Sequence, residues 1–330
     1  MPLPSPVMPQ KAAWQHALRD AVRSAAELAR LLELPPGTVA ADAGFPLLVP
    51  RGFVARMRKG DPADPLLLQV LPQAEEELER PGFGPDPLGE HGLAAGGVLQ
   101  KYRGRALLIA TGACPVHCRY CFRRAFPYDT QLAARGDWRL ALEALAASDD
   151  VTEVILSGGD PLSLSNARLE RLVERLERLP RLTTLRLHTR FPVVVPERVD
   201  EGLVGLLRAA RLRTVVVLHT NHANEIDAAV ERAVAALRAA RSTVLNQSVL
   251  LRRVNDDVDA LAALSERLFA AGALPYYLHL LDPVAGAAHF EVPEARGREL
   301  VAALRARLPG YLVPRLVRET PGAPGKTVVG

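Results

Sequence analysis

The sequence predicts an α/β fold: an open, partial (β/α)6 barrel of the TIM type, preceded by a helical, loop-rich N-terminal extension. From residue 105 onward, short apolar runs alternate with amphipathic stretches about six times. Strands separated by helices pair in parallel, because each crossover returns the chain to the same end of the sheet. Six units are too few for the usual closed barrel of eight, so the predicted barrel stays open.

The first 100 residues are expected to form the extension. Residues 12–34 carry apolar side chains at helical spacing, which predicts one helix with the stripe Trp14, Leu18, Val22, Ala25, Leu28 and Leu32. Residues 35–100 are rich in Pro, Gly and Asp, as in LPPG, KGDPADP and RPGFGPDP, and show no clear period. We therefore divide the chain into the extension, 1–100, and the barrel with its C-terminal loop, 101–330.

Within the barrel, the strands are expected where short apolar runs could be buried on both faces. These runs are 105–110, 151–156, 183–188, 214–219, 242–248 and 275–281. The amphipathic stretches, which predict helices, are 137–147, 166–179, 197–210, 223–240, 257–271 and 293–307. Polar motifs follow the strands in order, namely a cysteine cluster, SGGDP, HTR, HTNH, NQS and LLDP. Since parallel strands end at one rim, we expect these motifs to meet there.

The overall composition suits a large enzyme domain and excludes several classes. The chain has 330 residues, 48% hydrophobic content and no run of about eighteen apolar residues, so no membrane partner is expected. The start of the chain lacks the pattern of a secretory signal, which favours a cytoplasmic protein. The net charge of +4 is spread over helical faces that mix arginine with glutamate, so nucleic acid is not an expected partner.

All three cysteines of the chain, Cys114, Cys118 and Cys121, lie in the segment TGACPVHCRYCFRR. A structural zinc site usually has four ligands, and His117 would have to chelate awkwardly to serve as the fourth. A redox dithiol would need only one Cys-x2-Cys pair, and an odd cluster argues against disulfides. We favour an iron–sulfur cluster with three protein ligands and one open iron, with zinc or another cluster as the alternative.

This loop resembles the motif of the radical S-adenosylmethionine superfamily, in which the open iron binds the amino and carboxylate groups of that molecule. Tyr120 fits the same pattern. The segment SGGDP supports the resemblance, because Gly158 and Gly159 allow a ligand to approach the backbone and Asp160 can accept from an ammonium group. The alternative for SGGDP is a tight turn before a helix, with Asp160 or Ser163 as its cap.

Lysine is rare in this arginine-rich chain, with only Lys11, Lys59, Lys101 and Lys326. Lys326 lies in TPGAPGKT, a segment expected to be a loop, and many loop lysines are simply solvated. A lysine at a barrel rim can also form a Schiff base with pyridoxal phosphate, which arginine cannot do. Arg105 and the basic segment QKYRGR, which contains Tyr102, could then receive the phosphate.

Taken together, the chain from about residue 50 onward resembles the lysine 2,3-aminomutase family of radical S-adenosylmethionine enzymes. The resemblance is carried by KYRGRALL, CPVHCRYCFRR, SGGDPL, HTNHANE, NQSVLLRRVND, LLDPVAGAAHFEVP and APGKT. The short length resembles the branch that makes β-lysine for attachment to elongation factor P. That branch lacks the zinc-binding C-terminal extension of other members.

The resemblance implies three cofactors: a 4Fe-4S cluster, S-adenosylmethionine and pyridoxal phosphate. It implies that the three cysteines ligate the cluster and that Lys326 carries pyridoxal phosphate. The residues implied to contact S-adenosylmethionine are Ser157, Gly158, Gly159, Asp160, His219 and Gln247. The residues implied to bind the substrate are Arg123 for its carboxylate, and Asp282 and Glu319 for its side-chain ammonium group.

The implied activity is isomerisation of L-α-lysine to β-lysine. An electron donor such as flavodoxin or ferredoxin and a functional link to the elongation factor P lysyl-ligase are the implied partners. The alternatives are a glutamate-type aminomutase, whose second carboxylate Asp282 and Glu319 would repel, and a non-catalytic iron–sulfur protein. Two positions depart from the family pattern: Glu319, where better-known members have Asp, and Gln100, where relatives often have His.

Overall fold

An open sheet of nine strands forms the centre of the molecule. The computed structural model describes residues 12–39, 44–91, 96–131 and 136–330. Seven strands run parallel: β2 (Arg105–Thr111), β3 (Glu153–Gly158), β4 (Thr184–Thr189), β5 (Arg213–His219), β6 (Thr243–Val249), β7 (Leu274–His279) and β8 (Arg315–Arg318). Two more pair antiparallel at the edges: β1 (Val98–Tyr102) and β9 (Thr327–Val328).

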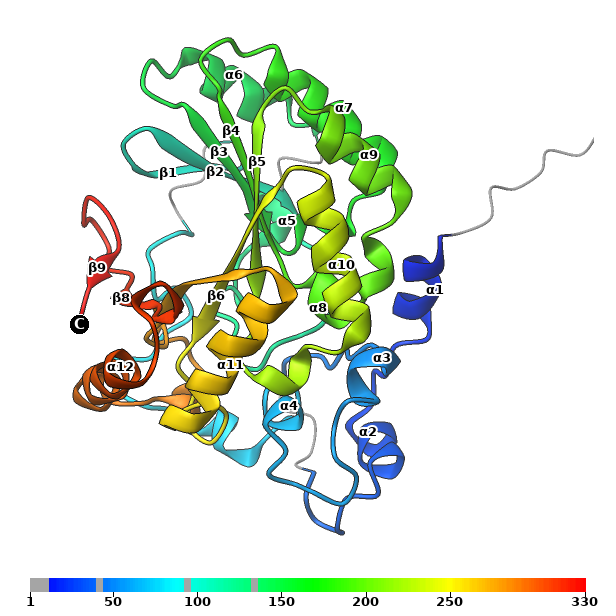
Figure 1. Ribbon diagram of the computed structural model, residues 1–330, viewed down its shortest axis with the longest axis vertical. Coiled ribbons are helices and arrows are strands. Elements are labelled where there is room, and N and C mark those ends of the chain that lie inside the picture. The colour runs from blue at the N-terminus through cyan, green and yellow to red at the C-terminus, as the bar shows by residue number, and fades with distance from the viewer. Residues whose placement is uncertain (1–11, 40–43, 92–95, 132–135) are drawn as a thin grey trace, which may run out of the picture.

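The strands follow one another in chain order from β1 to β9, and the two edge strands do not pair with each other. The sheet therefore curves without closing, as Figure 1 shows. The predicted partial barrel is confirmed, and all six predicted strands are present. The structure adds β8 as a seventh parallel strand, together with the short strands at both edges.

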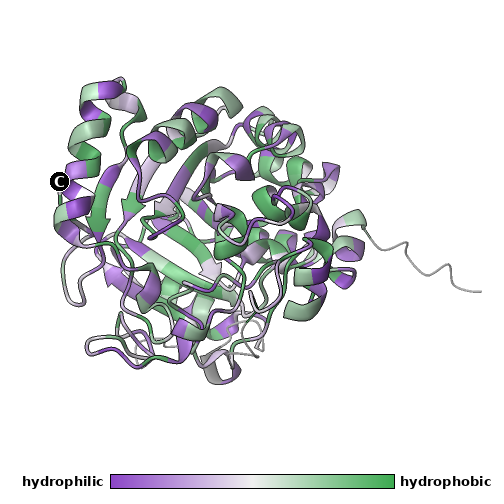
Figure 2. Ribbon diagram, turned by 90° about the horizontal axis from the view of Figure 1, so that it is seen from below, coloured by the Kyte–Doolittle hydropathy of each residue, from purple (hydrophilic) through white to green (hydrophobic). Residues whose placement is uncertain are grey.

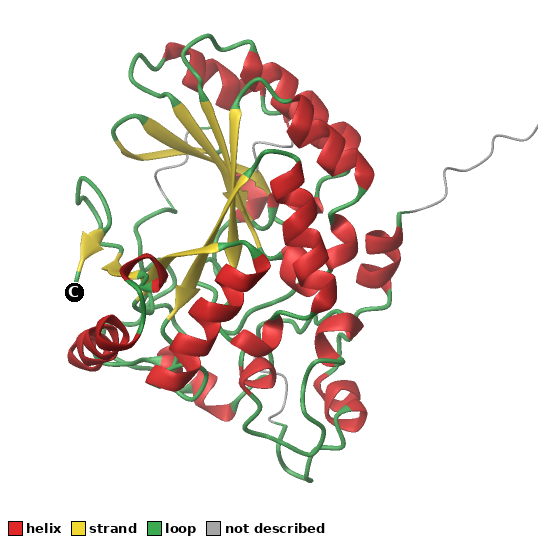
Figure 3. Cartoon of the chain, viewed as in Figure 1, coloured by secondary structure: helices red, strands yellow, loops and turns green. Residues whose placement is uncertain are grey.

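Helices cover the outer, convex side of this sheet (Figure 3). The long ones are α6 (Arg139–Ala147), α7 (Asn166–Glu177), α9 (Glu201–Ala209), α10 (Ala228–Ala239), α11 (Val258–Ala271) and α12 (Glu294–Arg307), in agreement with the sequence. The shorter ones are α5 (Tyr128–Gln131), α8 (Phe191–Val194), η3 (Pro161–Ser163), η4 (Pro196–Arg198), η5 (Ala223–Glu225), η6 (Ala288–Phe290) and η7 (Gly310–Leu312). Figure 2 shows strands that are largely hydrophobic inside helices of mixed character.

The amphipathic pattern of α7 illustrates how the helices attach to the sheet. Its apolar stripe, Leu169, Leu172, Val173 and Leu176, is buried, whereas its arginines and glutamates lie outside the stripe. The side chain of Ser165 accepts a hydrogen bond from the backbone N–H of Arg168 and so caps the helix start. Burial of apolar area on this scale is the main stabilising contribution to such a helix.

The single helix predicted over 12–34 is wrong, because two helices occupy this stretch: α1 (Ala13–Arg19) and α2 (Ala25–Leu31). The chain breaks between them, where the backbone of Val22 exchanges hydrogen bonds with Val49 at 2.8 and 2.9 Å. Ser24 then caps α2 by accepting from Glu27 N. The apolar spacing is nevertheless real, since Trp14, Val22 and Leu28 are all buried.

The rest of the extension is mostly loop, with α3 (Arg51–Val54), α4 (Pro65–Leu68) and η1 (Ala74–Glu77). Its side chains Phe53, Leu66 and Leu67 share one hydrophobic core with barrel residues such as Leu108 and Val154. The division of the chain at residue 100 stays a prediction. Within the described ranges, no helix is both long and apolar enough to cross a bilayer.

Candidate functional site

A cavity of about 560 Å³ runs along the inside of the open barrel. Its wall contains every site residue that the sequence predicted: Tyr102, Arg105, Cys114, Cys118, Cys121, Arg123, Ser157, Gly158, Gly159, Asp160, His219, Gln247, Asp282, Glu319 and Lys326. These residues come from the β1–β2 turn, the ends of several parallel strands and the C-terminal hairpin. The barrel thus brings together positions that are more than 200 residues apart in the chain.

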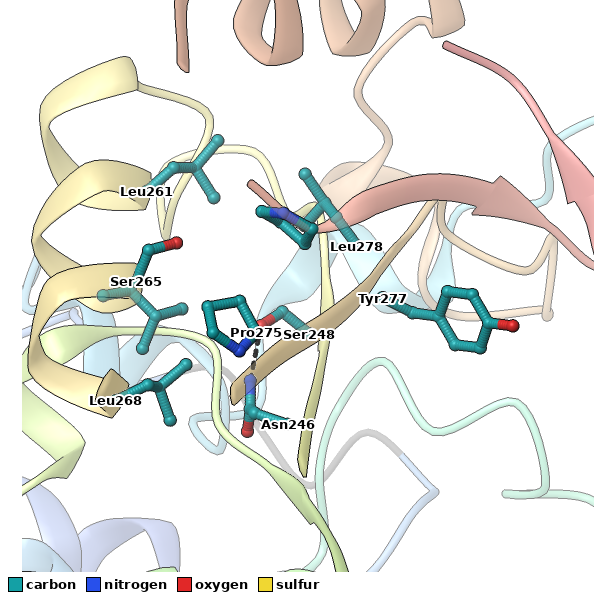
Figure 4. Close-up of a pocket in the computed structure, with 10 residues that line it drawn as sticks. Asn246, Ser248, Leu261, Ser265, Leu268, Pro275, Tyr277 and Leu278 are labelled. Carbon is teal, nitrogen blue, oxygen red and sulfur yellow. Dashed lines mark hydrogen bonds between the residues drawn. The ribbon is translucent and has the colours of Figure 1, made fainter. Parts of the chain in front are cut away.

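A second hollow, of about 10 Å³, lies between β6, β7 and α11. Figure 4 shows Asn246 and Ser248 hydrogen-bonded to each other beside Leu261, Ser265 and Leu268. Such a space holds about one water molecule. It is too small for a metabolite, so the large cavity is the candidate site.

The cysteine loop follows β2 and is held by the extension. His117 N donates to Leu48 O at 3.0 Å, and Arg119 N donates to Gln69 O at 2.9 Å. The buried Arg119 side chain donates from Nε to Glu76 Oε1 at 2.7 Å. A loop fixed in this way presents its cysteines to the cavity in one arrangement, which a metal centre requires.

Burial raises the pKa of the Cys114 thiol well above its usual value, and the charges of Cys121 and Asp160 raise it further. Burial likewise raises the pKa of Cys121 to about 11, with Cys118 as the next contribution. Three thiolates can therefore share this place only with a bound cationic centre. Sulfur ligands of this kind suit iron–sulfur clusters and other soft metals.

The zinc alternative finds no support in the geometry. Within the ranges that the structure describes, no group of three or more Cys, His, Asp or Glu side chains could hold a single metal ion. The Nδ1 atom of His117 lies 3.0 Å from Pro46 O and is occupied there. A cluster differs from a single ion because it spreads its ligands over separate irons. The three cysteines therefore fit an iron–sulfur cluster better than a zinc ion.

The glycines of SGGDP bring the end of β3 against the chain that enters the cysteine loop. Gly159 N donates to Thr111 O at 2.7 Å, and Asp160 N donates to Ala113 O at 2.8 Å. A Cβ atom on Gly158, whose φ is +111°, would lie 2.6 Å from Thr111 O, and one on Gly159 would lie 2.4 Å from Ala113 O. The close approach that we expected for a ligand is thus already made by the protein itself.

The Asp160 carboxylate is also occupied by the protein. It accepts hydrogen bonds from Leu162 N at 3.0 Å, Thr189 Oγ1 at 2.8 Å and Arg190 N at 2.7 Å. Burial raises its pKa to about 6, against the opposing effect of these hydrogen bonds. Asp160 therefore caps η3 and ties the end of β3 to the end of β4, as the alternative interpretation of SGGDP proposed.

A methyl group at residue 159 should accordingly displace the cysteine loop. We expect Gly159→Ala to lower the iron content after anaerobic reconstitution by several-fold and to lower the melting temperature, because backbone atoms of Gly112 and Ala113 must move. The matched control is Gly205→Ala in α9, where a Cβ meets nothing within 4 Å and should be neutral or slightly stabilising. Wild-type iron content in Gly159→Ala would contradict the positioning role of this segment.

The C-terminal hairpin places Lys326 opposite Glu319. Strands β8 and β9 pair through Arg318 and Thr327, so the residues beside this pair face each other. Lys326 Nζ donates to one oxygen of Glu319, and Tyr102 Oη donates to the other. Burial alone would raise the pKa of Glu319, but the ion pair with Lys326 and these hydrogen bonds outweigh it and lower the pKa.

Asp282, which follows β7, completes an acidic end of the cavity. Burial, with the charge of Glu319 as the second cause, raises its pKa to about 7. Near neutral pH, this carboxyl group is therefore only partly ionised while no cation is bound. An added ammonium group would stabilise its charged form.

Another part of the wall is basic. Arg123 forms an ion pair with Glu90 and donates from Nη1 to Ser157 Oγ at 3.1 Å. Lys101 Nζ lies 2.7 Å from Glu90. The guanidinium of Arg105 lies 4.7 Å from the Tyr102 ring centre, and its buried Nε has no hydrogen-bond partner. An unpaired buried donor of this kind suits an anionic group such as a phosphate.

Histidines and tyrosines fill the middle of the cavity wall. The ring of His219 stacks on Tyr120, and its Nε2 lies 3.1 Å from Tyr120 Oη. Burial lowers the pKa of His219 to about 3, so this side chain is neutral. Gln247 of β6 lies beside His219 in the sheet register. The two residues pair across neighbouring strands, and both line the cavity as adjacent polar groups.

The sequence analysis did not single out several residues that line the same cavity: Glu90, Tyr277 and His279. His188 and Arg190 also line it and belong to the HTR motif that was expected at this rim. His279 ends β7, so the rule that polar strand ends meet at one rim could have found it. Glu90 lies in a loop without any period. No sequence signal marks it as a cavity residue.

No family model matches the chain. The crystal structure of Streptococcus suis SuiB covers 67% of this chain and 50% of its own at 15% identity, with a TM-score of 0.47. A radical SAM methyltransferase from Sphaerobacter thermophilus covers 67% of this chain and 68% of its own at 19% identity, with a TM-score of 0.44. Likeness at this level adds nothing about the chemistry of the site.

An open parallel barrel whose first parallel strand leads into three cavity-lining cysteines is consistent with the resemblance to radical S-adenosylmethionine enzymes. Relatives of known function give the family. The chain is 46% identical to L-lysine 2,3-aminomutase of Escherichia coli strain K12, over 97% of this chain and 95% of that one. It is 45% identical to that of Haemophilus influenzae over 98% and 97%, and 32% identical to that of Clostridium subterminale over 96% and 77%. The chain belongs to the lysine 2,3-aminomutase family of isomerases.

Proposed function

We propose that this chain is a pyridoxal phosphate-dependent lysine 2,3-aminomutase that converts L-α-lysine to β-lysine. One observation carries the proposal: a single cavity holds the three cysteines, Lys326, a basic wall at Arg123 and an acidic end at Asp282 and Glu319. When bound, the cluster would supply the electron that cleaves S-adenosylmethionine, and pyridoxal phosphate would supply an aldehyde that holds the amino nitrogen of the substrate during its transfer from Cα to Cβ.

The residues of the chain would hold these groups in place. The three cysteines would ligate the cluster, and the Lys326 amine would attach pyridoxal phosphate. Arg105, with its unpaired Nε, and Tyr102 would face the phosphate. His219, Gln247 and the Ser157–Gly159 backbone would contact S-adenosylmethionine, while Asp160 keeps that segment in position because its oxygens already accept from the protein.

The charge distribution selects the substrate. A basic wall accommodates an α-carboxylate, and two acids accommodate a distal ammonium group, as in lysine. Glutamate would place a second carboxylate beside Asp282 and Glu319, where like charges repel. Lysine is therefore favoured over glutamate, the substrate of the alternative aminomutase class.

Two further parts of the proposal rest on the resemblance to the short branch of the family. A flavodoxin or ferredoxin would reduce the cluster, and the β-lysine product would serve an elongation factor P lysyl-ligase. These partners would place the protein in the cytoplasm. Transfer of the isolated product to elongation factor P by that ligase would test the second part.

The test of the substrate compares lysine with glutamate. Wild-type protein, assayed for iron and pyridoxal phosphate content, is incubated anaerobically with S-adenosylmethionine, a reductant and each amino acid, and the products are separated by chromatography. We expect β-lysine from lysine and no product from glutamate. Faster rearrangement of glutamate would reject lysine as the substrate.

Removal of the Asp282 charge should cripple turnover without disturbing the cofactors. Loss of one partner of a desolvated charge pair costs about 2–5 kcal/mol, or roughly 30- to several-thousand-fold in kcat/KM. We expect this loss in Asp282→Asn, with iron and pyridoxal phosphate contents unchanged. Asp149→Asn, at an exposed surface position, is the control.

The same carboxyl group predicts a pH dependence. Because the pKa of Asp282 is raised to about 7, its charged form is lost as the pH falls through that value. We expect the KM for lysine to rise between about pH 8 and about pH 6 in the wild type. The dependence should disappear in Asp282→Asn. A KM that rises equally in both proteins would assign the effect to another group.

A further inference from the structure

Glu90 is a buried acid in the cavity wall, and none of the roles proposed above uses it. It is 3% exposed and lies in the Gly- and Pro-rich loop before β1. The carboxylate of Asp86 holds this loop by accepting from Glu90 N at 2.8 Å and His91 N at 2.9 Å. These two hydrogen bonds fix the backbone at Glu90 and thereby the position from which its side chain starts.

The carboxylate of Glu90 binds one edge of the Arg123 guanidinium. Arg123 Nε donates to Oε2 at 2.7 Å, and Nη2 donates to Oε1 at 3.2 Å, which makes a bidentate pair. Nη1 faces Ser157 Oγ at 3.1 Å and Gly158 O at 3.4 Å. The guanidinium has five N–H donors. Four of them have the partners just named, so the second N–H of Nη2 remains for a ligand.

Glu90 also binds Lys101, whose Nζ lies 2.7 Å from Oε1. One anion thus lies between two cations, and the three groups together carry a net positive charge. Burial would raise the pKa of Glu90, but Arg123 and Lys101 outweigh it and lower the pKa to about 2. The carboxylate is charged at any working pH, so the arrangement is permanent.

We propose that Glu90 is a positioning residue, which holds Arg123 so that the remaining N–H of its Nη2 meets the substrate carboxylate. The inference rests on the proposed function, because it needs an amino-acid substrate in this cavity. Without Glu90, Arg123 and Lys101 would repel each other, and the Arg123 guanidinium would lose the pair that fixes its plane. The surplus positive charge would allow the substrate carboxylate to bind beside the carboxylate of Glu90.

The experiment measures equilibrium binding of radiolabelled lysine to protein loaded with pyridoxal phosphate, without S-adenosylmethionine, so that no turnover occurs. Lysinamide, which lacks the carboxylate, is measured in parallel. We expect Glu90→Gln to weaken lysine binding about tenfold or more, and to change lysinamide binding much less. A merely structural defect would weaken both ligands equally, and that result would overturn the proposal.

Asp64→Asn is the matched control, because Asp64 is likewise a buried acid, which pairs with Arg58 and caps α4 outside the cavity wall. It should lower the melting temperature comparably but leave lysine binding unchanged. Should Glu90→Gln fail to fold, Glu90→Asp keeps the charge and shortens the side chain, and lysine should again lose more affinity than lysinamide. If the wild type does not bind lysine, the proposed function fails. If the wild type binds lysine and Glu90→Gln binds it equally well, only the role of Glu90 fails.

Discussion

Replacement of any one of Cys114, Cys118 or Cys121 by Ala is expected to abolish both iron binding and turnover. The chain contains no fourth cysteine that could substitute for the lost ligand. Two cysteines cannot replace the three ligands that the cluster requires, so no stable cluster remains after the loss of one. Iron and sulfide content, the visible absorbance and β-lysine formation should all fall to background after anaerobic reconstitution.

His117→Ala is the informative companion to these variants. His117 lies between two of the cysteines, and a Cys3His zinc site would lose its metal with this change. Because its Nδ1 atom is bonded to Pro46 O, we expect His117→Ala to retain the cluster. Near-normal iron and activity in any cysteine variant would reject the cluster assignment, and metal loss in His117→Ala would revive the zinc alternative.

The barrel was predictable because its strands and helices carry their own periodic signals. The runs 105–110 and 214–219 are apolar on both faces, as buried parallel strands require, and they became β2 and β5. Strand β8 and the edge strand β9 have only four and two residues, some of them exposed, and exist only through pairing with the rest of the sheet. The break at Val22 also depends on a distant partner, Val49, which no local pattern reveals.

The candidate site shows the same limit at the level of single residues. A motif such as SGGDP signals a close approach of the backbone, but not what approaches it, and here the partner is the Thr111–Ala113 segment. Asp160 reads in sequence as a free acceptor, yet its oxygens are filled by the neighbouring strand end. Glu90 had no signal because its importance comes only from the fold, which places it against Arg123 and Lys101.

Lys326→Ala should eliminate covalent attachment of pyridoxal phosphate and reduce turnover by at least about a thousandfold, since a covalent amine has no substitute at that position. Of the three lysines within the described ranges, Lys101 and Lys326 line the cavity, but they differ in their partners. Lys101 is held by Glu90 in the basic wall, whereas Lys326 comes from the β8–β9 hairpin and pairs with Glu319 at the acidic end. Lys326 also lies 5.7 Å above the Tyr277 ring.

The direct measurement is reduction of the loaded protein with borohydride, followed by peptide mapping. We expect the label on Lys326 in the wild type, no label in Lys326→Ala, and an unchanged iron content in both, because the cysteine loop takes no part in the hairpin. Lys59→Ala, which removes a surface ion pair with Glu33, should keep the label and the activity. If the hairpin carries the cofactor, the label should be lost only when Lys326 is replaced. Recovery of the label on Lys101 would contradict the assignment, because the attachment point would then lie in the basic wall. The proposed mechanism needs it at the acidic end.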